Sequence, residues 1–328
     1  MKKVFITGAN GMLGSHICRA LLQQGYAVKA MCLKGAPTAT INTLPIEVVF
    51  GDILDREFLL EAMKGCDYVI HVAAMTNVWP RRFPFLRRVN IEGTKNVVEV
   101  AEVLKIKRMV HVGSASSFNH GSMAQPGNEN SLYQGWQHGM DYLDSKYEAQ
   151  EMLVKKHNDA AFPVIIINPT FMIGAFDSGP SSGQLLINLY KGKLPGYTEG
   201  GKNFVCTKDV ASAAVSALEH GKLGECYIAG NQNLSYKDFF SKASEVMHKP
   251  FKLKRMPMFL VLLVGILSSI AAKISGKKPK ISYSIAKFSG LQQYFSAQKA
   301  HVELQMPHTP LEIGIQEALD WFKENGYI

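Results

Sequence analysis

Tyr142 and Lys146 stand four residues apart in a segment, 140–150, that has the composition of a helix. On a helix the two side chains share one face. A free phenol titrates at about pH 10, and a neighbouring ammonium favours the phenolate and lowers that pKa. The pair is therefore suited to moving a proton to or from a substrate oxygen at neutral pH. The spacing alone is weak support, because most such pairs on helices are exposed and do no chemistry.

A serine is the third candidate for chemistry. Ser114 lies two residues past the apolar run 108–112, and a hydroxyl at that place can hydrogen-bond a substrate oxygen and hold it beside Tyr142. Ser116 and Ser117 compete for the same role. The alternative interpretation is a polar loop whose hydroxyls satisfy the local backbone, as serine clusters commonly do.

The N-terminal segment has the pattern of a dinucleotide-binding turn. An apolar strand over 2–7 leads into Gly8, Gly11 and Gly14, and a helix with one apolar side follows over 12–24. In such a turn the first glycine permits the tight bend, the second lets the backbone approach a pyrophosphate, and the third lets the helix pack on the sheet. The free N–H groups at the helix N-terminus then receive the phosphates. A glycine-rich turn without a ligand is the alternative.

Short apolar runs alternate with amphipathic helices through the first two thirds of the chain. We expect further strands over 27–33, 47–50, 68–72, 108–112 and 164–168, and helices over 56–63, 90–104 and around Tyr142. This alternation predicts an α/β fold with a Rossmann-type, doubly wound parallel sheet. Ligands of such sheets bind beyond the carboxyl ends of the strands, so the loops holding these candidates converge.

The chain divides into two expected units. We assign 1–168 plus 204–230 to a dinucleotide-binding domain, and 169–203 plus 231–328 to a smaller, mainly helical C-terminal substrate region. We also expect Thr207 to cap a helix over 208–220, and Ser235 to open a capping box.

Composition is that of a globular enzyme. The 328 residues are 47% hydrophobic and 19% charged, and the five cysteines have no metal-ligand spacing. We therefore expect no metal site, reduced thiols and a cytoplasmic protein; the first strand begins at once, so we expect no signal peptide. The net charge is +9, with basic residues distributed along the chain and no nucleic-acid motif. That charge favours an anionic cofactor or an anionic membrane surface, and not nucleic acid.

A hydrophobic segment, 256–272, carries no charge over seventeen residues. Basic residues flank it on both sides: Lys252, Lys254, Arg255, Lys273, Lys277, Lys278 and Lys280. A buried or lid helix over an apolar substrate pocket is the favoured interpretation. A helix lying on an anionic membrane surface, with peripheral contact through 256–280, comes second. A membrane-spanning helix comes last, because seventeen residues are at the lower limit of a span. The first two both imply a lipophilic substrate.

Several further motifs occur in the order seen in extended short-chain dehydrogenases/reductases, the NAD-dependent epimerase/dehydratase family. Beside the glycine turn, Ser114, Tyr142 and Lys146, they are Gly51-Asp52, the run 71–74, Val89-Asn90, Gly93-Thr94, Asn96, and the runs 168–174, 204–210 and 224–228. The match covers most of the chain and becomes loose after about residue 245. Within the family, the chain most resembles the branch of dihydroflavonol reductases and 3β-hydroxysteroid dehydrogenases.

The resemblance implies roles for individual residues. Tyr142 would be the general acid that protonates a carbonyl, Lys146 would lower its pKa and hold the nicotinamide ribose, and Ser114 would orient the carbonyl. Asn90 would stabilise the loops beneath the cofactor, and His71 is interpreted as a satisfied structural histidine. The implied cofactor-binding residues are Gly8, Asn10, Gly11, Met12, Leu13, Gly14, Lys34, Asp52, Ile53, Val72, Ala73, Ala74, Asn90, Tyr142, Lys146, Pro169 and Met172.

Two departures from the family pattern narrow the function. The second strand ends without the carboxylate that binds the ribose hydroxyls of NAD, and Lys34 is placed to meet a 2′-phosphate, so we expect NADPH in preference to NAD. Relatives that prefer NADPH often have arginine where Leu33 stands, and an exposed loop lysine is the alternative for Lys34. Dehydratases carry Asp-Glu after the active-site hydroxyl; Ala115 and Ser116 stand here, which argues against dehydration.

We therefore expect an NADPH-dependent reductase of a ketone or aldehyde on a hydrophobic small molecule. A nucleotide-sugar epimerase that retains NAD and a 3β-hydroxysteroid-type dehydrogenase are the enzymatic alternatives. A dinucleotide-sensing protein without catalysis is the third, although Ser114, Tyr142 and Lys146 are all intact. The sequence is compatible with a homodimer.

Overall fold

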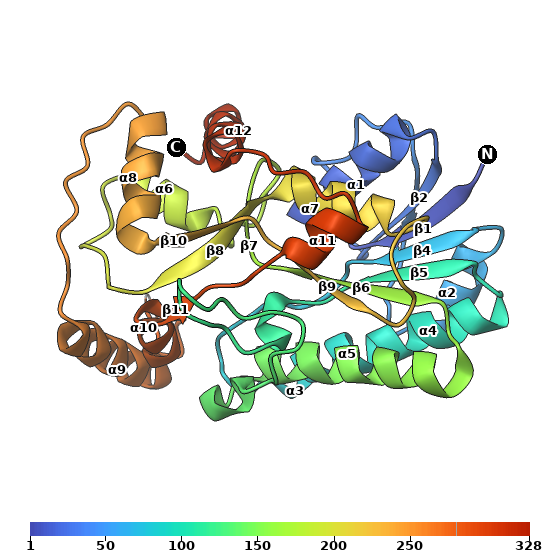
Figure 1. Ribbon diagram of the computed structural model, residues 1–328, viewed down its shortest axis with the longest axis horizontal. Helices are drawn as coiled ribbons and strands as arrows, with labels where there is room; N and C mark the ends of the chain where they lie inside the picture. Colours follow the sequence, from blue (N-terminus) through green and yellow to red (C-terminus); the bar gives the residue numbers. More distant parts are fainter. Residues whose placement is uncertain (280) are drawn as a thin grey trace.

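A seven-stranded parallel sheet forms the centre of the larger part of the protein (Figure 1). The computed structural model describes residues 1–279 and 281–328. The strand order is β3-β2-β1-β4-β5-β6-β9, which confirms the predicted doubly wound arrangement. The strands are β1 (Lys3–Thr7), β2 (Ala27–Cys32), β3 (Glu47–Phe50), β4 (Tyr68–His71), β5 (Arg108–Val112), β6 (Val164–Pro169) and β9 (Cys226–Ala229).

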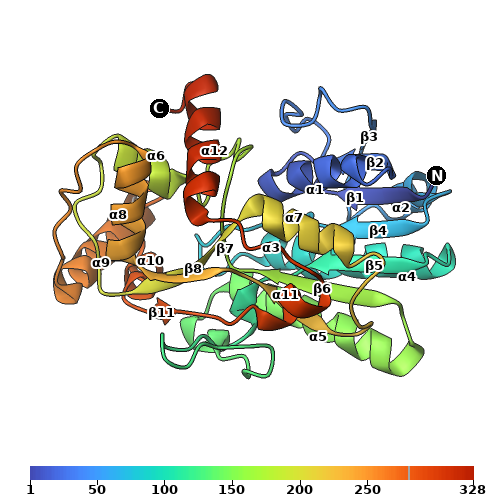
Figure 2. The same ribbon diagram turned by 45° about the horizontal axis from the view of Figure 1, so that its top comes forward.

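Helices cover both faces of this sheet (Figures 1 and 2). Successive strand residues point to opposite faces, so Val4 and Ile6 join one core cluster while Phe5 joins the other. The first face is covered by α1 (Met12–Gln23), α7 (Thr207–Ser216) and α11 (Gln298–Glu303). The second is covered by α2 (Arg56–Met63), α4 (Thr94–Val103) and α5 (Asp141–Ala160). Burial on both faces explains why the strands read as unbroken apolar runs.

The C-terminal region contains a second, smaller sheet that the sequence analysis did not predict. β8 (Gly201–Cys206) is its centre; β7 (Phe171–Ile173) and β11 (Gln292–Gln293) pair with it in parallel, and β10 (Gln232–Ser235) in antiparallel. Three helices pack around it: α6 (Gln184–Tyr190), α8 (Tyr236–Val246) and α12 (Leu311–Glu324). The crossing of β6 into β7 after Pro169 places this sheet beside the carboxyl edge of the large one.

Helix ends agree with the predictions in one case and differ in two. The Ser235 hydroxyl accepts from the backbone N–H of Asp238 at 3.1 Å, which confirms the cap of α8. Thr207 does not cap α7: it is the first helical residue, and its buried hydroxyl has no hydrogen-bond partner among the described residues. The expected helix over 90–104 is preceded by α3 (Pro84–Arg87) and a wider π-type turn over Arg88–Gly93, so only Thr94–Val103 is α-helical.

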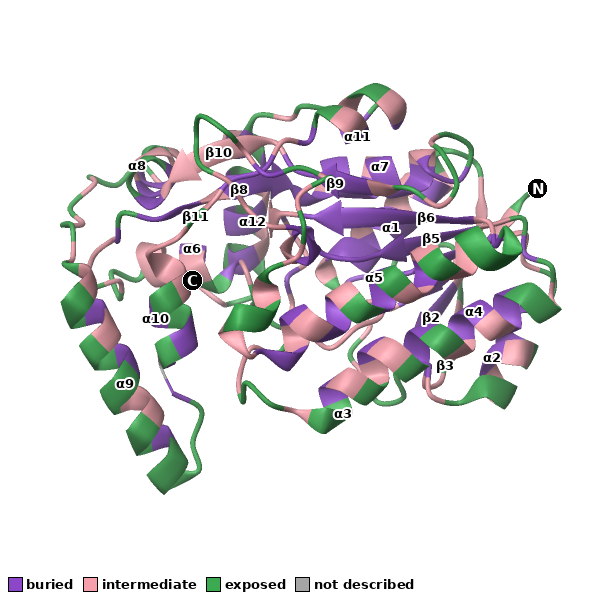
Figure 3. Ribbon diagram, turned by 60° about the horizontal axis from the view of Figure 1, so that its bottom comes forward, coloured by how far each residue is buried: buried purple, intermediate pink, exposed green. Residues whose placement is uncertain are grey.

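The hydrophobic segment forms α9 (Met258–Ser275), which is followed by α10 (Tyr283–Ser289). By length and composition α9 could cross a membrane, but only 17% of it is buried in the protein. Figure 3 shows α9 as a largely exposed rod beside α10, at the end of the molecule far from the N-terminus. The interpretation of a buried helix was therefore wrong: the apolar residues are there, but no core covers them. Lys280, part of the predicted contact segment, lies outside the described residues.

Candidate active site and dinucleotide-binding turn

The glycine turn after β1 has the close backbone approaches that the sequence predicts. Gly8 has a φ of +67°, and a Cβ there would lie 2.8 Å from the backbone nitrogen of Ala73. A Cβ on Gly14 would lie 2.1 Å from the Gly8 carbonyl oxygen. Gly11, directly before α1, has more room: its Cβ would meet only that same oxygen, at 3.4 Å.

This cradle fits the pyrophosphate of a dinucleotide. Met12 and Leu13 begin α1, whose first turn holds no acidic residue to offset the positive end of the helix dipole. Asn10 is held in place at the turn by two hydrogen bonds. Its side-chain amide donates to the Pro37 carbonyl at 2.9 Å, and its backbone carbonyl accepts from the Thr40 hydroxyl at 2.8 Å. The N–H groups at the start of α1, the positive end of the helix dipole and the glycine backbone therefore lie together, as binding of an anionic pyrophosphate requires.

A chain of hydrogen bonds beneath the turn fixes the state of His71. The Thr7 hydroxyl oxygen accepts from the backbone N–H groups of Val72 and Ala73, so its own proton goes to His71 Nδ1 at 2.7 Å. The other ring nitrogen must then carry hydrogen, and it donates to the Thr94 hydroxyl at 3.1 Å. Burial lowers the pKa of His71 to about 3. The expectation of a satisfied, structural histidine is confirmed.

Asn90 ties the loop after β4 to the helix that carries the candidate catalytic pair. Its amide nitrogen donates to the Met75 carbonyl and to the Ser145 hydroxyl, both at 3.0 Å, and its oxygen accepts from the Met75 N–H at 2.8 Å. These bonds agree with the expected role of stabilising the loops. Ala73 and Ala74 lie half-buried in the loop that Asn90 holds.

Residues expected near the adenosine half lie past the ends of β2 and β3, on the same edge of the sheet. Asp52 accepts from the Leu54 N–H at 2.9 Å, and Ile53 is buried with its side chain against Gly93. Lys34 is exposed two residues past β2, beside Leu33, which is 57% exposed. Lys34 is therefore free to approach a bound anion.

Among the three serines, Ser114 is the one that acts on Tyr142. Ser114 opens a 3₁₀ turn over Ala115–Ser117, and its oxygen accepts from the Ser116 N–H at 3.2 Å. Burial raises the pKa of the Tyr142 phenol, and the hydrogen bond between its side chain and that of Ser114 acts in the opposite direction. Ser117 is buried with no partner for its hydroxyl.

Lys146 is buried on the same helix and faces the end of β5. Its ammonium donates to the Val112 carbonyl at 2.9 Å, and burial lowers its pKa to about 8. It is not among the groups that shift the pKa of Tyr142, which differs from the expectation that it lowers that pKa. Desolvation is the largest influence on the pKa of the phenol. Two N–H groups remain for a ligand.

Two residues that the sequence analysis did not select hold this arrangement together. Asn168, at the end of β6, donates from its amide to the Ser114 carbonyl at 3.0 Å and to the Gln150 side-chain oxygen at 2.8 Å. Gln150 lies one turn beyond Lys146 on α5, so the bonds connect β5, β6 and α5. In the sequence, Asn168 could have been noticed as a polar residue at the end of the apolar run 164–167. Pro169 and Met172, which the resemblance assigns to cofactor binding, follow on β6 and β7.

The side of the site that faces the small sheet contains a second, half-buried cation. Lys202 on β8 donates to the Gln293 side-chain oxygen at 2.7 Å and lies 5.3 Å from the Phe171 ring. Burial lowers the pKa of Lys202 to about 8. His138, in the loop before α5, packs on Phe288 with ring centroids 4.4 Å apart. No spacing in the sequence pointed to Lys202, because β8 and β11 meet only in the folded chain.

Two arginines near the site, Arg82 and Arg87, have carboxylate partners on α5. Arg82 pairs with Asp141 at 2.9 Å and with Asp144 at 3.2 Å, and Arg87 pairs with Glu148 at 2.6 Å. These bonds fix the first turns of α5, directly beside Tyr142, and support a structural role.

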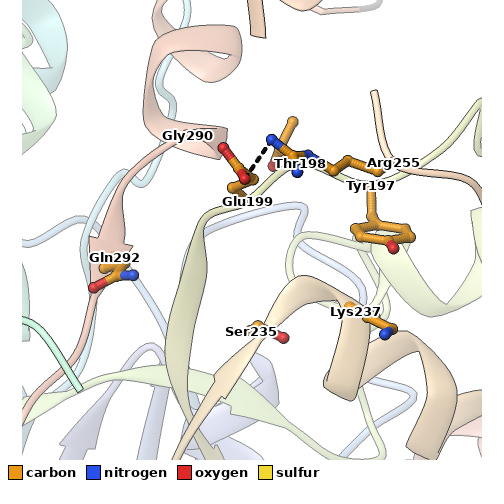
Figure 4. Close-up of a pocket in the computed structure, with 8 residues that line it drawn as sticks. All are labelled: Tyr197, Thr198, Glu199, Ser235, Lys237, Arg255, Gly290 and Gln292. Carbon is orange, nitrogen blue, oxygen red and sulfur yellow. Dashed lines mark ion pairs between the residues drawn. The ribbon is translucent and has the colours of Figure 1, made fainter. Parts of the chain in front are cut away.

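An open hollow of about 720 Å³ lies elsewhere, between the start of α8 and the end of α10 (Figure 4). Its lining includes an ion pair between Glu199 and Arg255, and it contains none of the candidate catalytic residues. We do not assign the reaction to it, because nothing there resembles an acid–base pair.

Comparison with known proteins agrees with the geometry. Residues 4–230 match the model of the NAD dependent epimerase/dehydratase family. A Synechocystis sp. protein named "Putative dihydroflavonol 4-reductase" is 28% identical over 331 residues, which cover 99% of this chain and 95% of that protein. A Stigmatella aurantiaca protein named "4-hydroxy-2-methyl-3-oxo-4-farnesyl-3,4-dihydroquinoline-1-oxide ketoreductase" is 30% identical over 231 residues, 69% of this chain and 67% of that one. The crystal structure of gox2253 has a TM-score of 0.87 and 27% identity, and each chain covers 100% of the other.

The room at Gly11 gives a test of the cradle. Gly11→Ala adds a methyl group that the folded protein tolerates, so we expect an unchanged melting temperature. The methyl occupies the approach path of the pyrophosphate, so dinucleotide affinity should fall by about tenfold or more. Isothermal titration calorimetry measures the affinity, with Gly179→Ala as the control, since a Cβ there meets nothing within 4 Å. Unchanged affinity in Gly11→Ala would contradict the assignment of the cradle.

Proposed function

The chain belongs to the NAD dependent epimerase/dehydratase family and is an NAD(P)-dependent oxidoreductase of the extended short-chain type, and we propose that it reduces a ketone or aldehyde on a hydrophobic small molecule with NADPH. The observation that carries the proposal is the position of Lys146, four residues after Tyr142 on α5, with its ammonium donating to the carbonyl of Val112, two residues before Ser114. The influence of the Ser114 side chain on the pKa of the Tyr142 phenol supports the same grouping. The residues after Ser114 are Ala115 and Ser116, which supply no further acid or base for elimination. The farnesylated ketone in the name of the Stigmatella relative supports a lipophilic carbonyl substrate.

The proposed mechanism assigns one task to each side chain. The bound dinucleotide would supply the hydride to the carbonyl carbon. Ser114 donates a hydrogen bond to the carbonyl oxygen and holds it within reach of the Tyr142 phenol. Tyr142 donates its proton to that oxygen as negative charge develops. The Lys146 ammonium would hold the ribose hydroxyls with the two N–H groups that its bond to Val112 leaves available.

The proposed preference for NADPH rests on charge. The end of β2 carries no carboxylate to repel a 2′-phosphate, and the exposed Lys34 supplies a cation there. The Lys34 ammonium attracts the charged 2′-phosphate of NADPH more strongly than the uncharged ribose hydroxyls of NADH. The lysine would therefore favour NADPH over NADH.

Tyr142→Phe tests the mechanism. Removal of the phenol hydroxyl should lower turnover by roughly 10²- to 10⁴-fold while NADPH binding stays nearly unchanged. Turnover is followed by NADPH absorbance and binding by NADPH fluorescence. Tyr147→Phe is the matched control: Tyr147 lies on the same helix, stacked on Tyr133 at 4.2 Å, and a phenyl ring keeps that stacking. Full activity of Tyr142→Phe would exclude Tyr142 as the acid.

The pH dependence of reduction has a defined sign. Reduction needs the acid forms of Tyr142 and Lys146, and the pKa of Lys146 is lowered to about 8. We therefore expect kcat/KM for reduction to fall as the pH rises through about 8. Lys146→Arg keeps its charge at higher pH, so the fall should move to higher pH, from a lower plateau. A rate that rises with pH over this interval would refute the assignment.

Lys34→Ala tests the cofactor preference. Removing the cation should weaken NADPH binding by roughly tenfold and leave NADH binding unchanged, because only NADPH carries the 2′-phosphate. Dissociation constants for both dinucleotides in the wild type and the variant give the result, and NADH serves as the internal control. Equal losses for both, or no loss for NADPH, would assign Lys34 to an exposed loop without a cofactor role.

A further inference from the structure

The helical hairpin of α9 and α10 carries its large apolar side chains outward. Six residues of α9 define what we call the apolar face, with exposed fractions between 42% and 84%: Phe259, Leu263, Ile266, Leu267, Ile270 and Ile274. Their spacing of three, four and seven residues puts them along one side of the helix. A helix that packs on a core turns its apolar side chains inward and its polar ones outward. The exposed apolar face of α9 therefore indicates an interaction surface.

Small residues occupy the inner side of α9, where it meets α10. A Cβ on Gly265 would lie 2.7 Å from the Ala286 side chain, so the two helices touch at that point. The Ser269 hydroxyl donates to the Gly265 carbonyl at 2.7 Å and accepts from the Tyr283 N–H at 2.9 Å. The inner side is therefore occupied by α10, and Val261, Gly265 and Ala272 are the buried residues of α9. The apolar face cannot turn inward without breaking these contacts.

Both legs of the hairpin are fixed to the chain that enters β8. Before α9, Met256 donates from its backbone N–H to the Tyr197 carbonyl at 2.8 Å, and the Lys254 carbonyl accepts from the Tyr197 N–H at 3.0 Å. After α10, the Leu291 carbonyl accepts from the Gly201 N–H at 3.0 Å. The two ends of the hairpin thus lie on one side of it. A single crossing of a membrane by α9 does not fit this return, since the seven residues of α10 rise only ~10 Å.

Charge is concentrated around the hairpin. Residues 246–302 hold ten of the 36 basic residues of the chain and none of its 27 acidic residues. The rest of the chain is close to neutral, which corrects the expectation that the basic residues are distributed evenly. Lys252, Lys254, Lys273, Lys277 and Lys278 are all exposed beside the two ends of α9.

We propose that the apolar face of α9 lies on an anionic membrane surface, with the flanking lysines against lipid head groups. Apolar side chains enter the boundary of the acyl chains, and the basic ends bind phosphate groups, which is the pattern of helices that lie in the membrane interface. A second copy of the chain fits less well, because it would bring an equally positive hairpin against the first. The membrane contact does not depend on the reductase function proposed above.

The hairpin is also connected to the candidate active site. Phe288 on α10 packs on His138 in the loop before α5, and β11 follows α10 with Gln293 on Lys202. A membrane-bound hairpin would therefore hold the substrate side of the protein close to the lipid surface, where a lipophilic substrate is concentrated.

Vesicle sedimentation with the full chain tests the proposal. Wild type should sediment with vesicles of phosphatidylcholine plus phosphatidylglycerol and stay in solution with phosphatidylcholine alone, and high salt should weaken the binding. Leu263→Ser/Leu267→Ser should weaken binding by about tenfold or more, because two large side chains leave the lipid boundary. Val302→Ser/Ile313→Ser, which removes exposed apolar residues from α11 and α12, is the matched control and should bind as wild type does.

Three outcomes would overturn the proposal. One is a wild-type protein that stays in solution with anionic vesicles. Another is equal binding by the Leu263→Ser/Leu267→Ser variant, with its melting temperature shown to be unchanged. The third is a wild-type dimer that the same variant converts to a monomer in analytical ultracentrifugation without lipid, which would assign the apolar face to self-association.

Discussion

The attachment of α5 to the carboxyl ends of β5 and β6 is the constraint on which the site depends. One face of the helix sends Lys146 to the Val112 carbonyl and Gln150 to Asn168, and Asn168 in turn holds the Ser114 carbonyl. The buried ammonium is costly to desolvate, as its lowered pKa records, and its bond to Val112 offsets part of that cost. Without this attachment, nothing would hold Tyr142 on α5 near Ser114 in the turn after β5.

A second set of bonds places the dinucleotide turn in the same frame. Thr7 at the end of β1 holds the backbone of Val72 and Ala73, Gly8 packs on Ala73, and Asn90 joins the following loop to Ser145 on α5. The turn and the proton-transfer residues are thus parts of one hydrogen-bonded network. The hairpin of α9 and α10 contacts the substrate side of the protein through Phe288, which packs on His138, and through β11, whose Gln293 accepts from Lys202. The surface of the hairpin is apolar and basic, whereas the candidate site consists of hydrogen-bonded polar side chains.

The sequence predicted the large sheet and the dinucleotide turn because both rest on local patterns. Unbroken apolar runs mark strands that are buried on two faces. Gly14 is required by its close approach to Gly8 in the same turn, and Gly8 by its close approach to Ala73, just past the neighbouring strand β4. The small sheet was missed, since β7 and β11 are two or three residues long and exist only by pairing with β8. Lys202 and Asn168 were missed for the same reason: their partners come from other elements. The exposure of α9 was misread because composition gives hydrophobicity, whereas burial depends on whether the rest of the chain offers a core.

The most direct test of the account is the balance between NADPH consumed and product formed. A panel of flavonoid, steroid, β-keto acid and simple aldehyde carbonyls, incubated with the purified protein, would be followed for dinucleotide oxidation and for alcohol by mass spectrometry. The account predicts one molecule of alcohol for each NADPH oxidised, and most activity on the lipophilic carbonyls. A protein that purifies with tightly held NAD, and that converts nucleotide sugars without net consumption of dinucleotide, would contradict it.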